Sequence, residues 1–246
     1  FGYKLHLMVD ATYELPVAFS VTPASESDID EAPKLLDQLK QRHPQVVERA
    51  ETLAADKAYD QTAFLVRLWD KERIKPVIDI RDMWKDGEPT KLVSGTRNVV
   101  YDCKGTVSCV CMSTGTQREM AYGGFEKDRN TLKYLCPAEH YGTACPDKGE
   151  CPVKRYVRIK LDEDRRVFTP MARSSYAWQR SYDQRTTVEH VNSRLDVSFG
   201  FERHFIRGQQ KMALRCGLAL IVMLAMAVGR VKENHEEHMR SLVWAA

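Results

Sequence analysis

The start of the sequence constrains the fold most, because it contains two strand-like segments joined by a short turn. In GYKLHLMVD, one side of an extended chain would carry Tyr3, Leu5, Leu7 and Val9. This two-residue period is typical of a half-buried β-strand. The following segment, ELPVAFSVTPA, is also strand-like, and Pro16 falls near its beginning, where a missing N–H is tolerated. The two segments therefore predict an antiparallel hairpin.

Helical and strand patterns alternate in the next part of the chain. SESDIDEAPKLLDQLKQRHP predicts a helix, because acids crowd its first turn, where the helix dipole favours negative charge. TLAA, a short apolar run, predicts a buried strand that leads directly into Asp56. QTAFLVRLWDKER has a helical apolar stripe, and IKPVIDIR predicts another strand. This order predicts an α/β fold whose sheet has both parallel and antiparallel neighbours.

The character of the sequence changes between residues 82 and 173. This range contains glycines, short β-like runs such as TRNVVYDC, and six of the seven cysteines of the chain. We interpret it as a β-rich, cysteine-containing subdomain inserted into the α/β core. The predicted domains are therefore 1–81 for the first part of the core, 82–173 for the insertion, and 174–246 for helices that complete the core.

The segment SYDQRTTVEHVNSRL contains neither glycine nor proline and predicts a helix from Ser181 to Leu195. Its apolar stripe would pack inward, and an adjacent face would present Tyr182, Arg185, Glu189 and Asn192. On its own, the Arg185–Glu189 spacing is explained by a surface ion pair worth about 0.2–0.5 kcal/mol. A site is favoured by Asp56, because open α/β sheets bind ligands at the carboxyl ends of their strands.

Four segments, GYKLHLMVD, LPVAFSVTPASESD, AADKAYD and YDQRTTVEHVNSRL, together resemble bacterial insertion-sequence DDE transposases, whose catalytic core is RNase H-like. In that family the second catalytic Asp follows an apolar strand in a motif that DKAYD matches from Asp56 to Asp60. The third acid lies in a YxxRxxxE motif on a late helix, which Tyr182, Arg185 and Glu189 match. The resemblance covers most of the chain, and the order of the motifs is more specific than any single one.

The resemblance implies an enzyme in the full-length parent that hydrolyses DNA at element ends and then joins the freed 3′-hydroxyl to target DNA. Asp56 and Glu189 would hold Mg²⁺ or Mn²⁺, because two such ions can clamp the attacking and leaving oxygens. Arg185 would orient Glu189 or contact phosphate, and Tyr182 would donate a hydrogen bond to a phosphate oxygen.

Further expectations concern DNA contacts and partners. The family has a Lys seven residues beyond the Glu, where this chain has Asp196; Arg194 is a nearby positive charge, and Asn192 shares the proposed face. The resemblance implies binding to transposon-end and target DNA, a homodimer when active, and a cytoplasmic, nucleoid-associated bacterial protein. The net charge of +3 is compatible with a polyanionic partner without requiring one.

The first catalytic Asp of the family lies on a strand upstream of GYKLH, and this chain starts at Phe1 without an initiator Met. These observations predict an N-terminally truncated fragment that binds metal poorly and cleaves little or no DNA. Asp10 is better explained as a turn residue than as the first catalytic Asp. Two alternatives remain open: a catalytically inactive DNA-binding remnant, and a nuclease on the same core.

The segment LCPAEHYGTACPDKGECP contains candidate zinc ligands, which are Cys136, His140, Cys145 and Cys151. Thiolate and imidazole groups suit tetrahedral Zn²⁺, but the gaps here are wider than a C-x-x-C knuckle. Other ligands after folding include Cys103, Cys109 and Cys111. Structural zinc and reduced, unligated cysteines both remain open as explanations.

The most apolar stretch of the chain runs from Gly217 to Gly229. At this length it is too short to cross a bilayer, which needs about 20 apolar residues. We therefore expect a buried helix and no membrane association.

Overall fold

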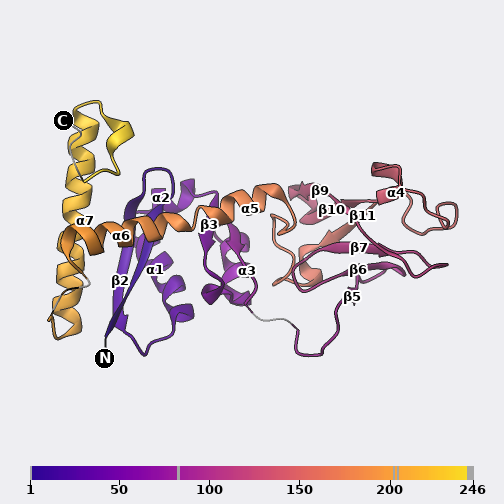
Figure 1. The fold of residues 1–246 in the computed structure, drawn as a ribbon, viewed down its shortest axis with the longest axis horizontal. Coiled ribbons are helices and arrows are strands. Elements are labelled where there is room, and N and C mark those ends of the chain that lie inside the picture. The colour runs from indigo at the N-terminus through magenta and orange to yellow at the C-terminus, as the bar shows by residue number, and fades with distance from the viewer. Residues whose placement is uncertain (1, 82–83, 202, 204, 243–246) are drawn as a thin grey trace. The chain divides into compact units, whose positions relative to one another are not determined.

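The computed structural model of the chain describes residues 2–81, 84–201, 203 and 205–242 (Figure 1). The chain divides into two compact units. Unit 1 comprises Phe1–Arg49 and Gln184–Ala246, and unit 2 comprises Ala50–Asp183. Each unit contains buried apolar clusters of its own.

The predicted hairpin is confirmed in unit 1. Strand β1 (Tyr3–Asp10) pairs antiparallel with β2 (Leu15–Pro23), and the register shifts between Met8 and Val9, where Val9 lies opposite Pro16. A proline is tolerated at such an irregularity because no ladder hydrogen bond is required of its nitrogen.

The turn of this hairpin gives Asp10 a local role. Its Oδ1 accepts the backbone N–H groups of Thr12 at 3.1 Å and Tyr13 at 2.8 Å. This is the short-range hydrogen bonding that favours Asp in turns. The interpretation of Asp10 as a turn residue is therefore confirmed.

Two helices follow the hairpin in unit 1, and two more come from the C-terminal part of the chain. Helix α1 (Asp28–Arg42) buries Leu35, Leu36 and Leu39 and contacts both strands of the hairpin. Helix α2 (Pro44–Arg49) begins at Pro44, the last residue of the segment SESDIDEAPKLLDQLKQRHP that was predicted as one helix. The C-terminal elements are α6 (Thr186–Phe199), α7 (Gln209–Lys232) and the 3₁₀ turn η4 (Glu236–His238).

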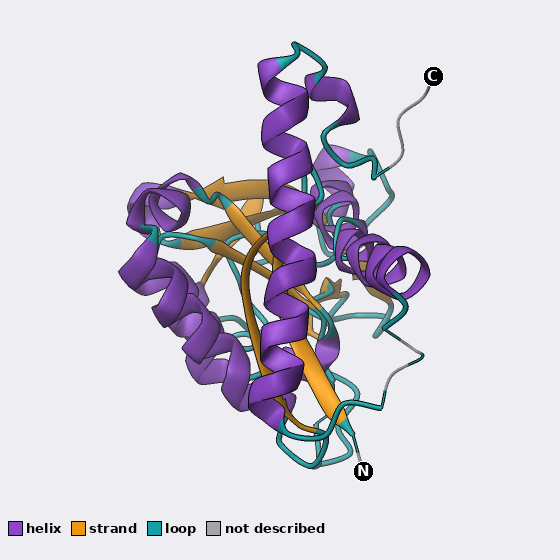
Figure 2. Ribbon diagram, turned by 90° about the vertical axis from the view of Figure 1, so that its left-hand side faces the viewer, coloured by secondary structure: helices purple, strands orange, loops and turns teal. Residues whose placement is uncertain are grey.

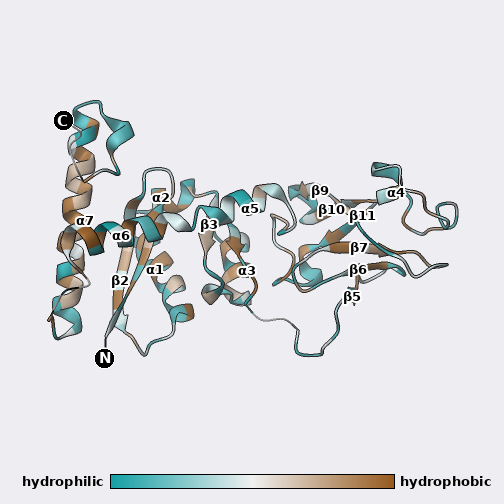
Figure 3. Cartoon of the chain, in the orientation of Figure 1, coloured by the Kyte–Doolittle hydropathy of each residue, from teal (hydrophilic) through white to brown (hydrophobic). Residues whose placement is uncertain are grey.

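Helix α7 differs from its prediction in length and in burial. It has 24 residues and continues through Gly217. Figure 2 shows α7 lying across the strands of the hairpin, and α7 contacts β2. The residues of α7 that are buried include Met212, Cys216 and Leu220. The other face exposes apolar side chains along its length (Figure 3), namely Leu214, Leu218, Ile221, Val222, Leu224, Val228 and Val231. The expected full burial therefore holds for one face only.

The length of α7 also corrects the expectation that this segment is too short to span a bilayer. Among the helices of the described residues, α7 alone is long and apolar enough for a membrane span by length and composition. Core helices of soluble proteins pass the same criterion, and part of α7 packs against the hairpin.

Unit 2 begins with a small parallel sheet. Strand β3 (Thr52–Ala55) pairs parallel with β4 (Lys75–Ile78), and the 3₁₀ turn η1 (Lys57–Tyr59) and helix α3 (Thr62–Asp70) connect them. The predicted helical stripe is confirmed, because α3 buries Phe64, Leu65, Leu68 and Trp69. Helix α5 (Tyr176–Asp183) contacts both strands.

The remainder of unit 2 is rich in short strands, as expected. One sheet has the order β5-β6-β7-β8, with bounds Lys91–Leu92, Val99–Tyr101, Val107–Val110 and Gln117–Glu119. A second has the order β11-β10-β9, with bounds Tyr156–Lys160, Thr131–Leu135 and Ala121–Glu126. Short helical turns are η2 (Lys127–Arg129), α4 (Pro137–His140) and η3 (Leu161–Glu163). Side chains from both sheets share one core, which includes Val107, Tyr134 and Ile159.

The fold is therefore of the mixed α/β class, with its described strands in four small sheets. The helix predicted as continuous from Ser181 to Leu195 is interrupted. Helix α5 ends at Asp183 and α6 begins at Thr186, although Arg185 keeps helical dihedral angles. The predicted domain start at residue 82 lies outside the described residues, and the ranges 1–81, 82–173 and 174–246 stay a prediction.

Candidate functional site

Asp56 directly follows β3, as the sequence predicted. Its backbone carbonyl accepts the N–H of Tyr59 at 2.9 Å, which closes the η1 turn. The residue is exposed, and its carboxylate does not cap η1. The carboxyl group is therefore available to a ligand at the carboxyl end of a parallel strand, the usual ligand edge of such sheets.

Asp60, the second aspartate of DKAYD, has the opposite surroundings. Its carboxylate is fully buried, and Oδ2 accepts hydrogen bonds from Arg166 Nη2 at 2.6 Å and Nε at 3.0 Å. The backbone N–H of Arg81 donates to the same oxygen at 2.9 Å. Asp60 Oδ1 is buried without a hydrogen-bond partner among the described atoms. The Asp60 carboxylate therefore links Arg166 to the backbone of Arg81, beyond the end of β4.

A second arginine, Arg173, lies in the same region. Arg173 donates to the carbonyl oxygens of Val167 at 2.5 Å and Ile78 at 3.0 Å, which ties the segment before α5 to the end of β4. Burial lowers the pKa of its guanidinium to about 10, and the nearby Asp60 carboxylate opposes that effect. Arg173 therefore stays positive at neutral pH and balances the buried acid.

Helix α6 positions Glu189 in unit 1. Val191 and Leu195 are buried against the hairpin and α7, which fixes the inward face of α6. Glu189 lies in the first turn and is exposed, and Asn192 is half-buried. A carboxylate is favoured in a first helical turn by the helix dipole. The helix therefore presents Glu189 to solvent from a rigidly packed element.

Tyr182 and Arg185 lie at the junction of α5 and α6. The Tyr182 ring stacks on Trp178, with 4.7 Å between centroids and 15° between planes. Arg185 occupies the N-cap position of α6 and is half-buried. Both residues lie close in sequence to Glu189, as the YxxRxxxE spacing requires, but the interrupted helix places Tyr182 in unit 2 and Arg185 in unit 1.

Arg194 is engaged within the protein. Its Nη2 donates to the Glu14 backbone oxygen at 2.8 Å and lies 3.2 Å from the Glu14 carboxylate. His190 Nδ1 is 3.1 Å from the same carboxylate. Burial lowers the pKa of Arg194, and Glu14 opposes this. Arg194 therefore ties α6 to the hairpin turn, a role that spacing within α6 did not indicate.

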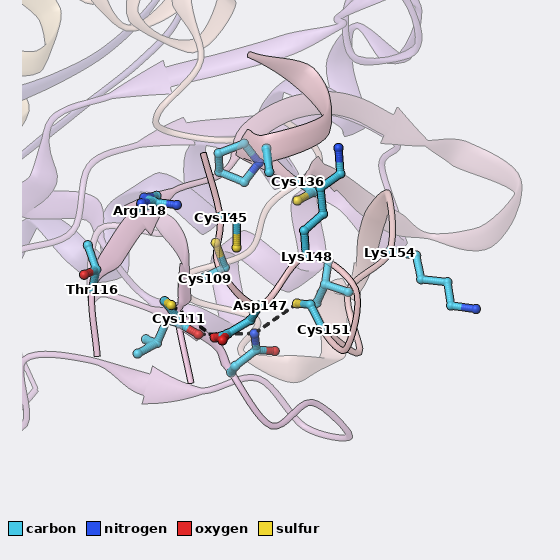
Figure 4. A pocket seen from close by; sticks show the side chains of 15 residues that line it. Cys109, Cys111, Thr116, Arg118, Cys136, Cys145, Asp147, Lys148, Cys151 and Lys154 are labelled. Atoms are coloured by element: carbon cyan, nitrogen blue, oxygen red, sulfur yellow. Dashed lines mark hydrogen bonds between the residues drawn. The ribbon is translucent and has the colours of Figure 1, made fainter. Parts of the chain in front are cut away.

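Five cysteines line one pocket in the β-rich part of unit 2 (Figure 4); they are Cys109, Cys111, Cys136, Cys145 and Cys151. Burial raises the pKa of the Cys109 thiol, and the nearby Cys136, Cys151 and Cys145 sulfurs raise it further. Cys111 is turned to Asp147, whose Oδ2 lies 3.1 Å from its sulfur.

His140 does not line this pocket. It is exposed, and its ring contacts Tyr141 with 4.6 Å between centroids. Cys109 lies in the pocket instead, on β7, far along the chain from the other three cysteines. The described part of the chain has no disulfide and no preformed metal-binding group of three or more His, Cys, Asp or Glu residues.

The comparisons with known proteins identify the class of the chain. Residues 1–225 match the family model described as the transposase DDE domain. The chain therefore belongs to the DDE transposase family, and the mixed α/β fold is consistent with the RNase H-like core expected for it. Searches of curated proteins and of solved structures found no match.

Proposed function

We propose that this chain is the catalytic domain of an insertion-sequence transposase, with Asp56 and Glu189 as its catalytic carboxylates. The family match over residues 1–225 supports the reaction class. The exposure of both residues supports the assignment, because an exposed carboxylate is accessible to a ligand. Asp56 follows strand β3, and Glu189 lies in the first turn of α6, whose Val191 and Leu195 are buried.

The two acids fit the preferences of Mg²⁺ or Mn²⁺, which take hard oxygen ligands and retain some water molecules. Asp56 and Glu189 would hold the ion; when bound, it would supply charge neutralisation at the scissile phosphate and an activated oxygen nucleophile. The same two acids serve hydrolysis and strand transfer, because each step is an in-line displacement at phosphorus.

The neighbouring residues act on the DNA or on the acids. Arg185 precedes Glu189 by one helical turn and contacts phosphate or orients the carboxylate, because a planar guanidinium suits oxyanions. Tyr182 donates a hydrogen bond from its hydroxyl to a phosphate oxygen. Asn192 contacts DNA from the same helix as Glu189. The role of Arg194 is indirect, because its contacts with Glu14 hold α6 in place.

The proposed partners are transposon-end DNA and target DNA, and the active form is a homodimer. We place the protein in the bacterial cytoplasm, where its DNA substrate lies. Basic residues on β11 are a further candidate contact, although Arg158 is already paired with Glu126 at 2.6 Å. Phosphate contacts would make DNA binding weaken as salt rises.

Cleavage of labelled element-end DNA by the full-length protein with Mg²⁺ tests this function. Glu189→Gln and Asp56→Asn should abolish both nicked and joined products. Matched controls are Glu48→Gln and Asp128→Asn, which change exposed acids outside the motifs and should leave both products intact. Equal activity of wild type, Glu189→Gln and Asp56→Asn would disprove the assignment.

The products separate the remaining alternatives. Nicked DNA without joined product would establish a nuclease on the same core. DNA binding that is equal in wild type and both variants, with no cleavage by any of them, would establish a catalytically inactive DNA-binding protein. Each of these results would replace the proposed transposase function.

A further inference from the structure

We propose that Cys109, Cys136, Cys145 and Cys151 form a structural Zn²⁺ site, with Cys109 in place of the histidine that the sequence indicated. This site is independent of the proposed transposase chemistry. It lies entirely within unit 2, and its ligands come from two sheets and the loop between α4 and β11.

The placement of the four sulfurs carries the proposal. Cys109 comes from β7, Cys136 directly follows β10, and Cys145 and Cys151 come from the long loop that precedes β11. All four line one pocket of about 30 Å³, and their sulfurs face its interior in Figure 4. A space of this size admits an ion or a water molecule and excludes an organic ligand, which needs about 300 Å³ or more.

The loop between α4 and β11 gives the metal a structural task. The segment from residue 141 to residue 155 has no strand or regular helix and few apolar side chains to bury. Its contacts with the rest of the chain are mostly polar, such as the hydrogen bonds from Thr143 to the Pro137 carbonyl at 2.8 Å and from the Ser113 N–H to Asp147 at 3.0 Å. A metal held by Cys145 and Cys151 of this loop, by Cys109 on β7 and by Cys136 directly after β10 would fasten the loop to the core. The sulfurs are not preformed ligands, so binding and local ordering would be coupled.

The surroundings of the pocket suit bound thiolates. Asn98 Nδ2 donates to Cys151 Sγ at 3.4 Å, the kind of outer contact that orients a metal ligand. Four thiolates around one Zn²⁺ carry a net charge of about −2. Arg118, Lys148 and Lys154 line the same pocket and would offset that charge.

Zinc content and cobalt spectroscopy of the purified full-length chain test the site. Wild type should hold about one zinc per chain and, after exchange with Co²⁺, show the absorption of a tetrahedral tetrathiolate site. Cys109→Ser should reduce the zinc content at least about tenfold. His140→Ala, Cys103→Ser and Cys216→Ser should retain full zinc, because none of these residues lines the pocket.

Two further variants separate loss of a ligand from loss of folding. Cys109→His should keep the zinc but change the cobalt spectrum to that of three sulfurs and one nitrogen. Asn98→Ala should keep four sulfur ligands and weaken zinc affinity about 10- to 100-fold. Both variants retain measurable binding, so the readout does not depend on a soluble zinc-free protein.

Three results would overturn the proposal. Zinc-free wild type after incubation with Zn²⁺ under reducing conditions would remove the site. Iron in place of zinc would contradict the metal assignment. Full zinc in Cys109→Ser together with zinc loss in His140→Ala would restore the histidine as the fourth ligand.

Discussion

The end of β3 and the buried network just beyond it contain two aspartates four residues apart in opposite surroundings. Asp56 is exposed and does not cap the following turn, whereas the Asp60 carboxylate is fully buried and paired with Arg166 at 2.6 Å. The same contrast occurs in unit 1, where Glu189 is exposed and Glu14 holds Arg194 and His190. Identical residue types therefore serve different tasks, and exposure and partners distinguish them.

From this contrast we propose that the exposed acids act on ligands and the buried acids stabilise the fold. An exposed carboxylate without an internal partner contributes little to folding, and its removal should affect only ligands. A buried carboxylate with several donors cannot be removed without leaving a buried charge unpaired. Four predictions test this division.

The largest effect is expected for the exposed acids. Asp56→Asn or Glu189→Gln should lower the rate of DNA cleavage at least about 1,000-fold, because loss of an essential catalytic group costs about 10⁴ or more in other enzymes. The free energy of unfolding should change by less than about 0.5 kcal/mol. Single-turnover cleavage and urea denaturation measure the two quantities. A large loss of stability would show that these acids, like Asp60, are needed for folding.

Asp60→Asn should show the reverse pattern in stability. The substitution removes the negative charge from a buried side chain that Arg166 and the Arg81 N–H contact, so we expect a cost of up to about 3 kcal/mol, the lower end of the range for a fully buried pair. Urea denaturation should therefore show the stability loss, with Asp128→Asn as the exposed control. Unchanged stability of Asp60→Asn would show that the buried pair is not important for folding.

Glu14→Gln should have a smaller effect on unit 1. Arg194 keeps its bond to the Glu14 carbonyl but loses the carboxylate at 3.2 Å, so we expect a cost of about 1–2 kcal/mol. Thermal denaturation measures the loss. Glu48→Gln, an exposed glutamate in α2, serves as the control and should be neutral. Equal melting temperatures for the two variants would contradict the tie between α6 and the hairpin turn.

The smallest effect is a pH dependence from His6. His6 is buried and bonded to Thr22 at 2.9 Å, and burial lowers the pKa of its imidazole below 6.5, with Asp28 and Glu31 opposing this. The folded state therefore favours neutral His6, and the stability that this preference contributes is fully present above pH 6.5. It is lost as pH falls through the lowered pKa, because the unfolded chain binds the proton more tightly. In His6→Gln, a denaturation series from pH 7.5 to 5 should lack this component; an identical slope would exclude His6 as its source.

Local patterns predicted much of the fold. Alternation in β1 and β2, the apolar stripe of α3, and the short apolar runs of β3 and β4 each determine an element almost alone. Helix α7 extends beyond the apolar stretch from Gly217 to Gly229 at both ends, although Gly is a poor helix former. A Cβ placed on Gly217 would lie 3.3 Å from the Phe19 ring, so the small residue permits close packing inside the helix.

The site itself stays a prediction; the sequence indicated on which elements the candidate residues lie, but it did not indicate their tertiary partners. The end of β3 and the first turn of α6 located Asp56 and Glu189. The pairing of Arg194 with Glu14 joins residues 180 positions apart, so no local pattern indicates it. Cys109 is likewise brought to the cysteine pocket only by the packing of β7. The break between α5 and α6 has no glycine or proline to mark it.

We propose that Asp56 and Glu189 hold the same cation, and a Mn²⁺ titration of the full-length protein followed by electron paramagnetic resonance measures whether they do. The titration compares wild type, Asp56→Asn, Glu189→Gln and the double variant. A shared site predicts that each single substitution weakens Mn²⁺ binding at least about tenfold. The double substitution should weaken it little further, because the two acids are coupled. Additive losses, or unchanged affinity in either single variant, would contradict the account.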